Sequence, residues 1–458
     1  MKTYCLILLT CLGGVPRPAM AQQPQASPAP AHVATLWADL TVQIMTRAPK
    51  NTPTYGSRAL GYLGLTMYET AIAATARQQS VAPYLSAGLV VPQLRHRRAY
   101  CPELAVNAAQ AHMLRALYAY TGSTARIDSM AAAVRAQYAA RCPAKMAEQS
   151  EQHGIAVAEA ICRWSCQDGG DEGYQRNFPK DYVLVAGKGM WTPPHVGQTT
   201  IRLPMHPSWG QNRVFVPGNT SLPMPKPLAY STDTASRYYQ EFNEVYTRNA
   251  NLTEAEREVV MWWGDDPNLT CSPPGHSYHL ATLAIRTSNA SLSKAAETYA
   301  RVGMAVADAF VVCWKTKFTY LVERPAAYIK EHIVSTGPVN YRRWYPFFLE
   351  PPFPSFYSGH ATQSAAMATV LTDLYGDSFA FLDDTHVSRA PLTYIYKSKF
   401  KTINFAPRPY ASFWAAAREC AESRLLGGIH TRYDNEVGLA EGTKIGTMVN
   451  ALPWGKKR

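Results

Sequence analysis

The feature that most constrains the fold of this chain is a series of long, Ala-rich stretches in which apolar residues recur every three or four positions. That spacing places the apolar side chains on one face of an α-helix. The stretches are residues 31–47, 57–78, 102–122, 124–141, 147–164, 234–249, 253–265, 278–292, 293–325, 363–375 and 413–424. Because strands do not alternate with these helices, we predict an all-α protein without a parallel sheet.

Residues 168–232 interrupt the helical pattern with Pro, Gly and Trp, which is typical of a long ordered connection. We therefore predict two helical bundles, residues 34–167 and residues 233–458. The functional site is expected between facing helices of the C-terminal bundle. A short β element is expected within residues 385–403, where aromatic and polar residues alternate.

The N-terminus has the pattern of a secretory signal peptide over residues 1–21: a basic residue, a short apolar run and Ala19-Met20-Ala21. Residues 22–33 are rich in Pro, Ala and Gln and are predicted to be a disordered lead-in. A lipoprotein signal ending at Cys11 is the alternative, although Thr10 is a poor residue before a lipidated cysteine. We expect export to the periplasm or the extracellular space. No later apolar run approaches the ~20 residues that span a bilayer.

Seven cysteines remain after the signal peptide: Cys101, Cys142, Cys162, Cys166, Cys271, Cys313 and Cys420. The odd number leaves at least one free thiol, and the absence of paired CxxC units argues against a structural zinc site. A bridge between helices that joins Cys101 to Cys142 or to Cys166 is compatible with the spacing, and the sequence does not rank the two. Cys313 and Cys420 are expected to be small buried residues.

The formal charge of +12 becomes +10 when Lys2 and Arg17 are removed with the signal peptide. A basic protein favours anionic partners. The chain has no long Lys/Arg run interleaved with aromatic residues and no known nucleic-acid motif. We therefore expect small anions, and no nucleic acid, as partners.

Lys317 and Arg324 are seven residues apart in a stretch predicted to be one helix, so their side chains should project from the same face before Pro325 ends the segment. A solvated basic stripe is the ordinary explanation of such a pair. The surrounding residues are mostly apolar and aromatic, however, and buried cations need an anion to offset their desolvation. The pattern therefore indicates an anion site.

Ser358-Gly359-His360 directly precedes an Ala-rich helix. Ser358 can act as the N-cap of that helix, and the first backbone N–H groups, with that of Gly359, can bind an anion. His360 falls in the first turn, where it can serve as a general acid or base. A single Ser-Gly at a helix start is common and has little meaning by itself.

A third motif occupies residues 423–434. The helix over residues 413–424 should end at Gly427-Gly428, with Arg424 in its last turn, and His430 and Asp434 should begin the next helix. Asp434 can accept a hydrogen bond from one nitrogen of His430, which leaves the other as a nucleophile or metal ligand. A surface helix pair would explain the same spacing. The three motifs together favour one shared site.

In that order on a helical chain, K-x6-R-P, S-G-H and S-R-x5-H-x3-D resemble the signature of the vanadium-dependent haloperoxidase and type 2 phosphatidic acid phosphatase superfamily. The signature covers about 120 residues. The resemblance implies that five residues hold the oxygens of vanadate or phosphate: Lys317, Arg324, Ser358, Gly359 (through its amide) and Arg424. It implies that His430 binds vanadium or attacks phosphorus, that His360 is the acid/base group and that Asp434 orients His430.

Further positions bear on the branch of the superfamily. Trp314 and Phe353 match aromatic positions that line the halide pocket of the chloroperoxidase branch, although core packing explains them equally well. Asp265 resembles the acidic partner that steadies the arginine equivalent to Arg424. Tyr357 departs from the proline that usually precedes the S-G-H motif. His276 and His279 lack a nearby third ligand in the sequence and are expected at the surface or in a loop.

The resemblance thus implies a vanadate-dependent haloperoxidase of the haloperoxidase branch. Its partners would be hydrogen peroxide, a halide and a small organic substrate, and its product hypohalous acid. A secreted acid phosphatase that forms a phospho-His430 intermediate, with phosphate in place of vanadate, is the alternative enzyme. A non-catalytic oxyanion-binding protein is the alternative of another class.

Overall fold

The computed structural model describes residues 29–94, 99–194, 196–266, 269–334, 344–396 and 399–455. The predicted signal peptide and most of the predicted lead-in lie outside the described residues.

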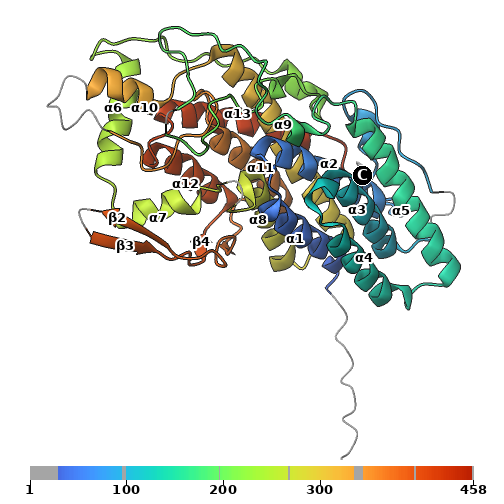
Figure 1. Cartoon of the computed structure of the whole chain (residues 1–458). Coiled ribbons are helices and arrows are strands. Elements are labelled where there is room, and N and C mark those ends of the chain that lie inside the picture. The colour runs from blue at the N-terminus through green and yellow to red at the C-terminus, as the bar shows by residue number, and fades with distance from the viewer. Residues whose placement is uncertain are drawn as a thin grey trace, which may run out of the picture.

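Helices make up most of the described chain, as Figure 1 shows, and the prediction of an all-α fold is confirmed. The first half contains α1 (His32–Arg47), α2 (Pro53–Ala71), α3 (Pro102–Tyr118), α4 (Thr124–Ala139) and α5 (Ala144–Ser165). The second half contains α6 (Arg237–Ala250), α7 (Glu254–Trp262), α8 (Ser272–Thr287), α9 (Leu292–Tyr320), α10 (Pro325–Tyr328), α11 (Gly359–Tyr375), α12 (Phe413–Leu426) and α13 (Arg432–Asn450). Single turns of 3₁₀ helix are η1 (Ala82–Tyr84), η2 (Ala119–Thr121), η3 (Gly173–Gln175), η4 (Trp209–Gln211) and η5 (Pro217–Ser221), and a π-helical turn, η6 (Ile329–Ile333), continues α10.

The described residues form two small antiparallel strand pairs, of which β2 and β3 lie near α7 at one end of the molecule (Figure 1). β2 (Leu392–Tyr396) pairs with β3 (Lys399–Ile403), which confirms the expected β element. β1 (Phe381–Asp383) pairs with β4 (Arg408–Tyr410), with Asp383 opposite Arg408. The second pair was not predicted, because three residues are too few to show a period of two.

Helices from the two halves of the chain pack closely on one another. α2 lies against α9 with almost no space between their backbones: an ideal Cβ built on Gly303 would lie 2.5 Å from the carbonyl oxygen of Leu60. The largest hydrophobic cluster draws on both halves of the sequence, from Ala31 to Trp454. The proposed division into bundles at residues 168–232 stays a prediction.

α13 packs on α11 through a stripe of three glycines, Gly438, Gly442 and Gly446. An ideal Cβ on Gly438 would lie 2.8 Å from the carbonyl oxygen of Ser358, and one on Gly442 would overlap the carbonyl oxygen of Thr362. Only a residue without a side chain allows such an approach. The stripe therefore brings the start of α13 next to the start of α11, which are the two places that carry the predicted site motifs.

The connection between the halves pairs with two non-helical segments of the C-terminal half. Met190 forms an antiparallel bridge with Val322, and Gly197 forms a parallel bridge with Glu350. A disulfide joins Cys101, before α3, to Cys142, after α4. It realises one of the two pairings that the sequence left open. Cys313 and Cys420 are buried, as expected.

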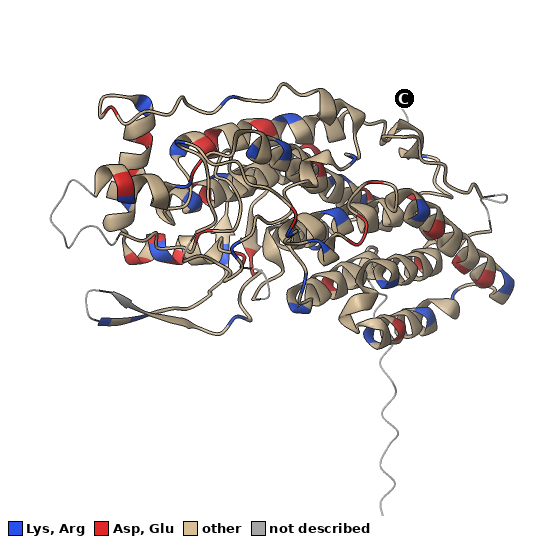
Figure 2. Cartoon of the chain, turned by 45° about the horizontal axis from the view of Figure 1, so that its top comes forward, with Lys and Arg blue, Asp and Glu red and all other residues tan. Residues whose placement is uncertain are grey.

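Acidic and basic residues are interspersed over the helices, as Figure 2 shows. Within the described residues, none of the helices combines the length and the apolarity that crossing a membrane requires.

Gly442→Ala should destabilise the protein by about 1–3 kcal/mol, because the new methyl group overlaps the backbone of α11. Alanine is otherwise the better helix former, so the sign of the effect isolates the close packing. Urea denaturation measures it. Gly455→Ala is the control, because a Cβ at Gly455 meets no atom within 4 Å. Equal stability of the two variants would contradict the proposed packing.

Candidate active site

Lys317 and Arg324 reach the same loop from different elements. α9 ends at Tyr320 because Leu321 adopts φ +51°, and Arg324 is the N-cap residue of α10. The prediction that both cations lie on one helix is therefore wrong. The Nζ atom of Lys317 nevertheless donates to the carbonyl oxygens of Pro354 (2.9 Å) and Ser355 (2.6 Å). The Nε atom of Arg324 donates to the adjacent carbonyl of Phe353 (2.9 Å).

The S-G-H motif begins α11 as expected. The Ser358 hydroxyl accepts a hydrogen bond from the N–H of Ala361, so Ser358 is the N-cap. Its own hydrogen stays available for donation to an oxyanion. His360 lies in the first helical turn, and its Nε2 atom is buried without a hydrogen-bond partner among the described residues. The start of α11 thus offers amide and hydroxyl donors beside an unpaired imidazole nitrogen.

His430 and Asp434 form the predicted pair. α12 ends at Leu426, Gly428 turns the chain with φ +81°, and Thr431 is the N-cap of α13. The Nδ1 atom of His430 lies 2.9 Å from Oδ2 of Asp434. Because the carboxylate accepts from Nδ1–H, Nε2 is the unprotonated nitrogen, and Nη1 of Arg324 lies 3.3 Å from it.

Ser355 belongs to the same group of side chains and was not among the predicted site residues. Its hydroxyl donates to Oδ2 of Asp434 at 2.5 Å and lies 3.3 Å from Nδ1 of His430. A serine in a proline-rich loop, 79 residues before its partner Asp434, gives no sequence signal that links it to the pair. Ser355 fixes the Asp434 carboxylate and, through it, the orientation of the imidazole.

Lys317, Arg324 and Arg424 are buried cations without a direct ion-pair partner among the described residues. Each is at most 1% exposed, and none forms an ion pair with a carboxylate within the described ranges. Burial lowers the pKa of Lys317 to about 7 and that of Arg324 to about 10, and it also lowers the pKa of Arg424. Nη1 of Arg424 is a buried donor that lacks a partner among the described residues. Such groups favour binding of an anion.

Both histidines are held neutral by these surroundings. Burial, followed by the charges of Arg324 and Lys317, lowers the pKa of His430 well below its ordinary value. Burial, followed by the charge of Arg424, does the same to His360. A neutral His430 presents an Nε2 lone pair to a ligand, and a neutral His360 can accept a proton.

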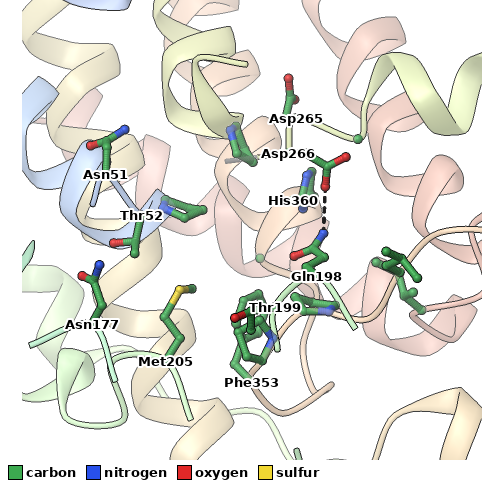
Figure 3. Close-up of a pocket in the computed structure, with 18 of the residues that line it drawn as sticks. Asn51, Thr52, Asn177, Gln198, Thr199, Met205, Asp265, Asp266, Phe353 and His360 are labelled. Carbon is green, nitrogen blue, oxygen red and sulfur yellow. Dashed lines mark hydrogen bonds between the residues drawn. The ribbon is translucent and has the colours of Figure 1, made fainter. Parts of the chain in front are cut away.

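A cavity of about 470 Å³ opens onto the site, and Figure 3 shows part of its lining. Gly359, His360, Arg424 and His430 line it together with Trp314 and Phe353. The Trp314 and Phe353 rings are 4.7 Å apart between centroids and form an aromatic wall. The polar side chains in its lining include Asn51, Thr52, Asn177, Gln198 and Thr199. The two aromatic residues are thus placed beside the oxyanion donors, and halide binding by them stays a prediction.

The resemblance suggests that Asp265 contacts Arg424 directly, whereas the structure places its carboxylate against two histidines. Its carboxylate accepts hydrogen bonds from Nδ1 of His276 (3.0 Å) and Nε2 of His386 (2.9 Å). No ion pair joins Asp265 to Arg424 within the described residues. Two imidazoles occupy its oxygens, and its charge acts on Arg424 only through space, where it raises the pKa against the larger lowering effect of burial.

The prediction that His276 lies at the surface or in a loop is wrong. His276 belongs to α8 and is 1% exposed. The stretch around Pro273 and Pro274 has a loop-like composition, but both prolines occupy the first turn of α8, where a missing N–H costs no helical hydrogen bond. His279 is on the same helix, is partly exposed and pairs with Asp384 at 2.6 Å.

A tetrahedral oxyanion fits this donor set. Nη1 of Arg424 and Nε2 of His360 are both buried and unpartnered among the described residues, and Nε2 of His430 carries a lone pair. Vanadate, which the family resemblance implies, would be held by His430 through Nε2 and by Lys317, Arg324, Arg424, Ser358 and the Gly359 amide through its oxygens.

Comparison with known proteins gives the same family. Residues 297–452 match the model of the VCPO second helical-bundle domain. Vanadium chloroperoxidase of Curvularia inaequalis is 23% identical over 216 residues, which cover 38% of this chain and 35% of that protein. The match thus spans about a third of the length of this curated relative.

Solved structures extend the likeness over most of the chain. A bacterial vanadium-dependent iodoperoxidase superposes with a TM-score of 0.80 at 27% identity, and the match covers 95% of this chain and 100% of that one. The holo form of a bacterial vanadium-dependent chloroperoxidase gives a TM-score of 0.63 at 14% identity, with 90% and 95% covered, which shows a common fold. These relatives are enzymes, and they confirm the resemblance to the vanadium-dependent haloperoxidase superfamily.

Oxyanion affinity should fall as the pH rises above 7. The pKa of Lys317 is about 7 in the anion-free protein, and a bound oxyanion raises it, so binding above pH 7 takes up a proton. The affinity for tungstate, a tetrahedral dianion that does not itself titrate in this range, should decrease by up to about tenfold per pH unit. Isothermal titration calorimetry measures this loss.

Lys317→Met is the matched control for the pH dependence, because the methionine side chain has a length similar to that of lysine and carries no titrating group. It should bind tungstate more weakly at every pH and lose most of the slope. An affinity of the unsubstituted protein that does not change with pH would contradict the placement of Lys317 against the anion.

Proposed function

We propose that this chain is a vanadium-dependent haloperoxidase that oxidises a halide with hydrogen peroxide at a vanadate held by His430 and releases hypohalous acid. The observation that carries the proposal is the set of three buried cations, Lys317, Arg324 and Arg424, which have no ion-pair partner among the described residues. The likeness to haloperoxidases favours vanadate over other tetrahedral oxyanions as the ligand of this cage.

The chain's own residues prepare the site in three ways. Asp434 and Ser355 fix the His430 ring so that Nε2 faces the oxyanion. Lys317, Arg324 and Arg424 bind and orient the oxyanion oxygens with donors that are already in place before binding. When bound, vanadate supplies Lewis-acid activation of peroxide without a change in its own oxidation state.

His360 is the group proposed to move protons. Its lowered pKa keeps the ring neutral, and its unpartnered Nε2 atom is then free to accept a proton from incoming peroxide. The negative charge of a bound oxyanion would raise the pKa of His360 again, which makes the protonated ring a donor later in the cycle. Lys317 would polarise the oxygen nearest to it through its ammonium group.

Iodide is the halide that we propose first. The iodoperoxidase gives the higher TM-score, 0.80 against 0.63, and the higher identity, 27% against 14%. The Trp314 and Phe353 wall would receive the halide beside Lys317, whose Nζ atom lies 5.4 Å from the Phe353 ring centroid. The 470 Å³ cavity has the size of a site for a small organic substrate.

Export of the protein is also part of the proposal. A signal peptide over residues 1–21 would direct the chain out of the cytoplasm. The disulfide between Cys101 and Cys142 supports an oxidising compartment such as the periplasm or the extracellular space.

The test of the function is peroxide-dependent halogenation of an activated carbon acid, with and without orthovanadate, in iodide, bromide and chloride. Turnover that requires vanadate supports the haloperoxidase. Phosphate-ester hydrolysis without halogenation would instead support an acid phosphatase with a phospho-His430 intermediate. Binding of vanadate with neither activity would support the non-catalytic oxyanion-binding protein.

Substitutions should separate binding of the oxyanion from turnover. Arg424→Ala and His430→Ala should abolish vanadate-dependent activity, because each removes a buried group that contacts the oxyanion. His360→Ala should lower kcat by about 10²–10⁴-fold and change the affinity for vanadate only a few-fold. Steady-state kinetics and equilibrium dialysis measure the two quantities.

His112→Ala, on α3, is the control for loss of a histidine, because His112 does not line the cavity. Full activity of Arg424→Ala or His430→Ala would place the site elsewhere. Loss of vanadate affinity in His360→Ala as complete as in Arg424→Ala would contradict the acid/base role.

A further inference from the structure

A second group of metal-ligating side chains lies behind the cavity wall, and we call Asp265, His276 and His386 the histidine cluster. Asp265 follows α7, His276 lies in α8 and His386 follows β1. All three are buried, at 1%, 1% and 2% exposure. One donor atom from each lies within 4.8 Å of the others. Three separate segments of the chain therefore converge on one small volume.

The cluster has the surroundings that orient metal ligands. The Nε2 atom of His276 lies 2.9 Å from Oδ2 of Asp383, on the opposite side of the ring from Asp265. Asp383 also accepts from Nε1 of Trp262 (2.9 Å) and from the N–H and hydroxyl of Thr385 (3.0 and 2.6 Å). A carboxylate on the outer nitrogen of a histidine fixes the ring and makes its inner nitrogen a stronger ligand.

We propose that Asp265, His276 and His386 bind a divalent first-row transition-metal ion of the zinc class. Two imidazole nitrogens and one carboxylate oxygen are a common ligand set for such ions, with a further position left for water. The ligand atoms would be Nδ1 of His276, Nε2 of His386 and a carboxylate oxygen of Asp265. This site shares no residue with the oxyanion cage, and the proposal does not depend on the proposed function.

The charge of the cluster favours a cation. Two buried carboxylates, Asp265 and Asp383, flank the His276 ring, with oxygens 3.0 Å and 2.9 Å from its two nitrogens. A divalent ion bound between Asp265, His276 and His386 would supply positive charge next to both carboxylates.

The backbone conformation at Asp265 is of the strained kind that clusters at functional sites. Asp265 adopts φ +48°, a left-handed conformation that is uncommon for a residue with a side chain. Asp265 and the next residue, Asp266, line the cavity near His360, as Figure 3 shows. A bound metal would therefore tie α8 and the segment after β1 to the wall of the active-site cavity.

The test is metal binding by the full mature chain in the absence of vanadate. After equilibration with Co²⁺ and gel filtration, we expect about one ion per chain and the visible absorption of four- or five-coordinate cobalt. Zn²⁺ should displace the cobalt and raise Tm. His276→Ala and His386→Ala should lose both signals. His279→Ala is the matched control on the same helix and should keep them.

Absence of bound cobalt and zinc from the unsubstituted protein would overturn the proposal and identify the cluster as a proton-linked ion network. Equal binding by His386→Ala and the unsubstituted protein would overturn it as well. Circular dichroism checks that each variant folds. If His276→Ala does not fold, His386→Ala still decides the test, because His386 lies outside the helices and strands. Because no step uses halide or peroxide, these results are independent of haloperoxidase activity.

Discussion

The burial of three cations that form no ion pair with a described carboxylate is the interaction on which the site depends. Desolvating one ammonium and two guanidinium groups is costly, and backbone carbonyls around Lys317 and Arg324 offset only part of that cost. The lowered pKa values of Lys317 and Arg324 reflect the same cost of desolvation. A multiply charged oxyanion bound among these donors would offset the desolvation cost through its negative charge. An oxyanion, which is also the proposed cofactor, therefore matches the charge of the site.

Helix packing decides where these charges meet. The glycine stripe of α13 allows backbone contact with α11, so the loop that carries His430 lies against the turn that carries Ser358. The N–H of Ser358 donates to the carbonyl oxygen of Asp434 at 3.1 Å, which joins the two motifs directly. The aromatic wall and the polar connection then enclose the cavity over this junction. The relative position of the two site motifs therefore depends on Gly438, Gly442 and Gly446, which allow the close contact between α13 and α11.

Much of this arrangement was predictable from the sequence, because it depends on local signals. Helical periodicity gave the fold class, and the spacing of His430 and Asp434 gave their hydrogen bond. The break of α9 at Leu321 was not predictable, since a left-handed leucine leaves no mark in a helical pattern. The histidine cluster was missed because Asp265 and His386 are 121 residues apart. Only tertiary packing brings such residues together, and no local pattern reports it.

The most direct test of the central claim is a crystal structure of the protein soaked with orthovanadate. The account predicts tetrahedral or five-coordinate density at Nε2 of His430, with Lys317, Arg324 and Arg424 in contact with its oxygens. Vanadate bound at another place, or a cavity without vanadate at concentrations that saturate binding in solution, would contradict the assignment of these cations to an oxyanion cage.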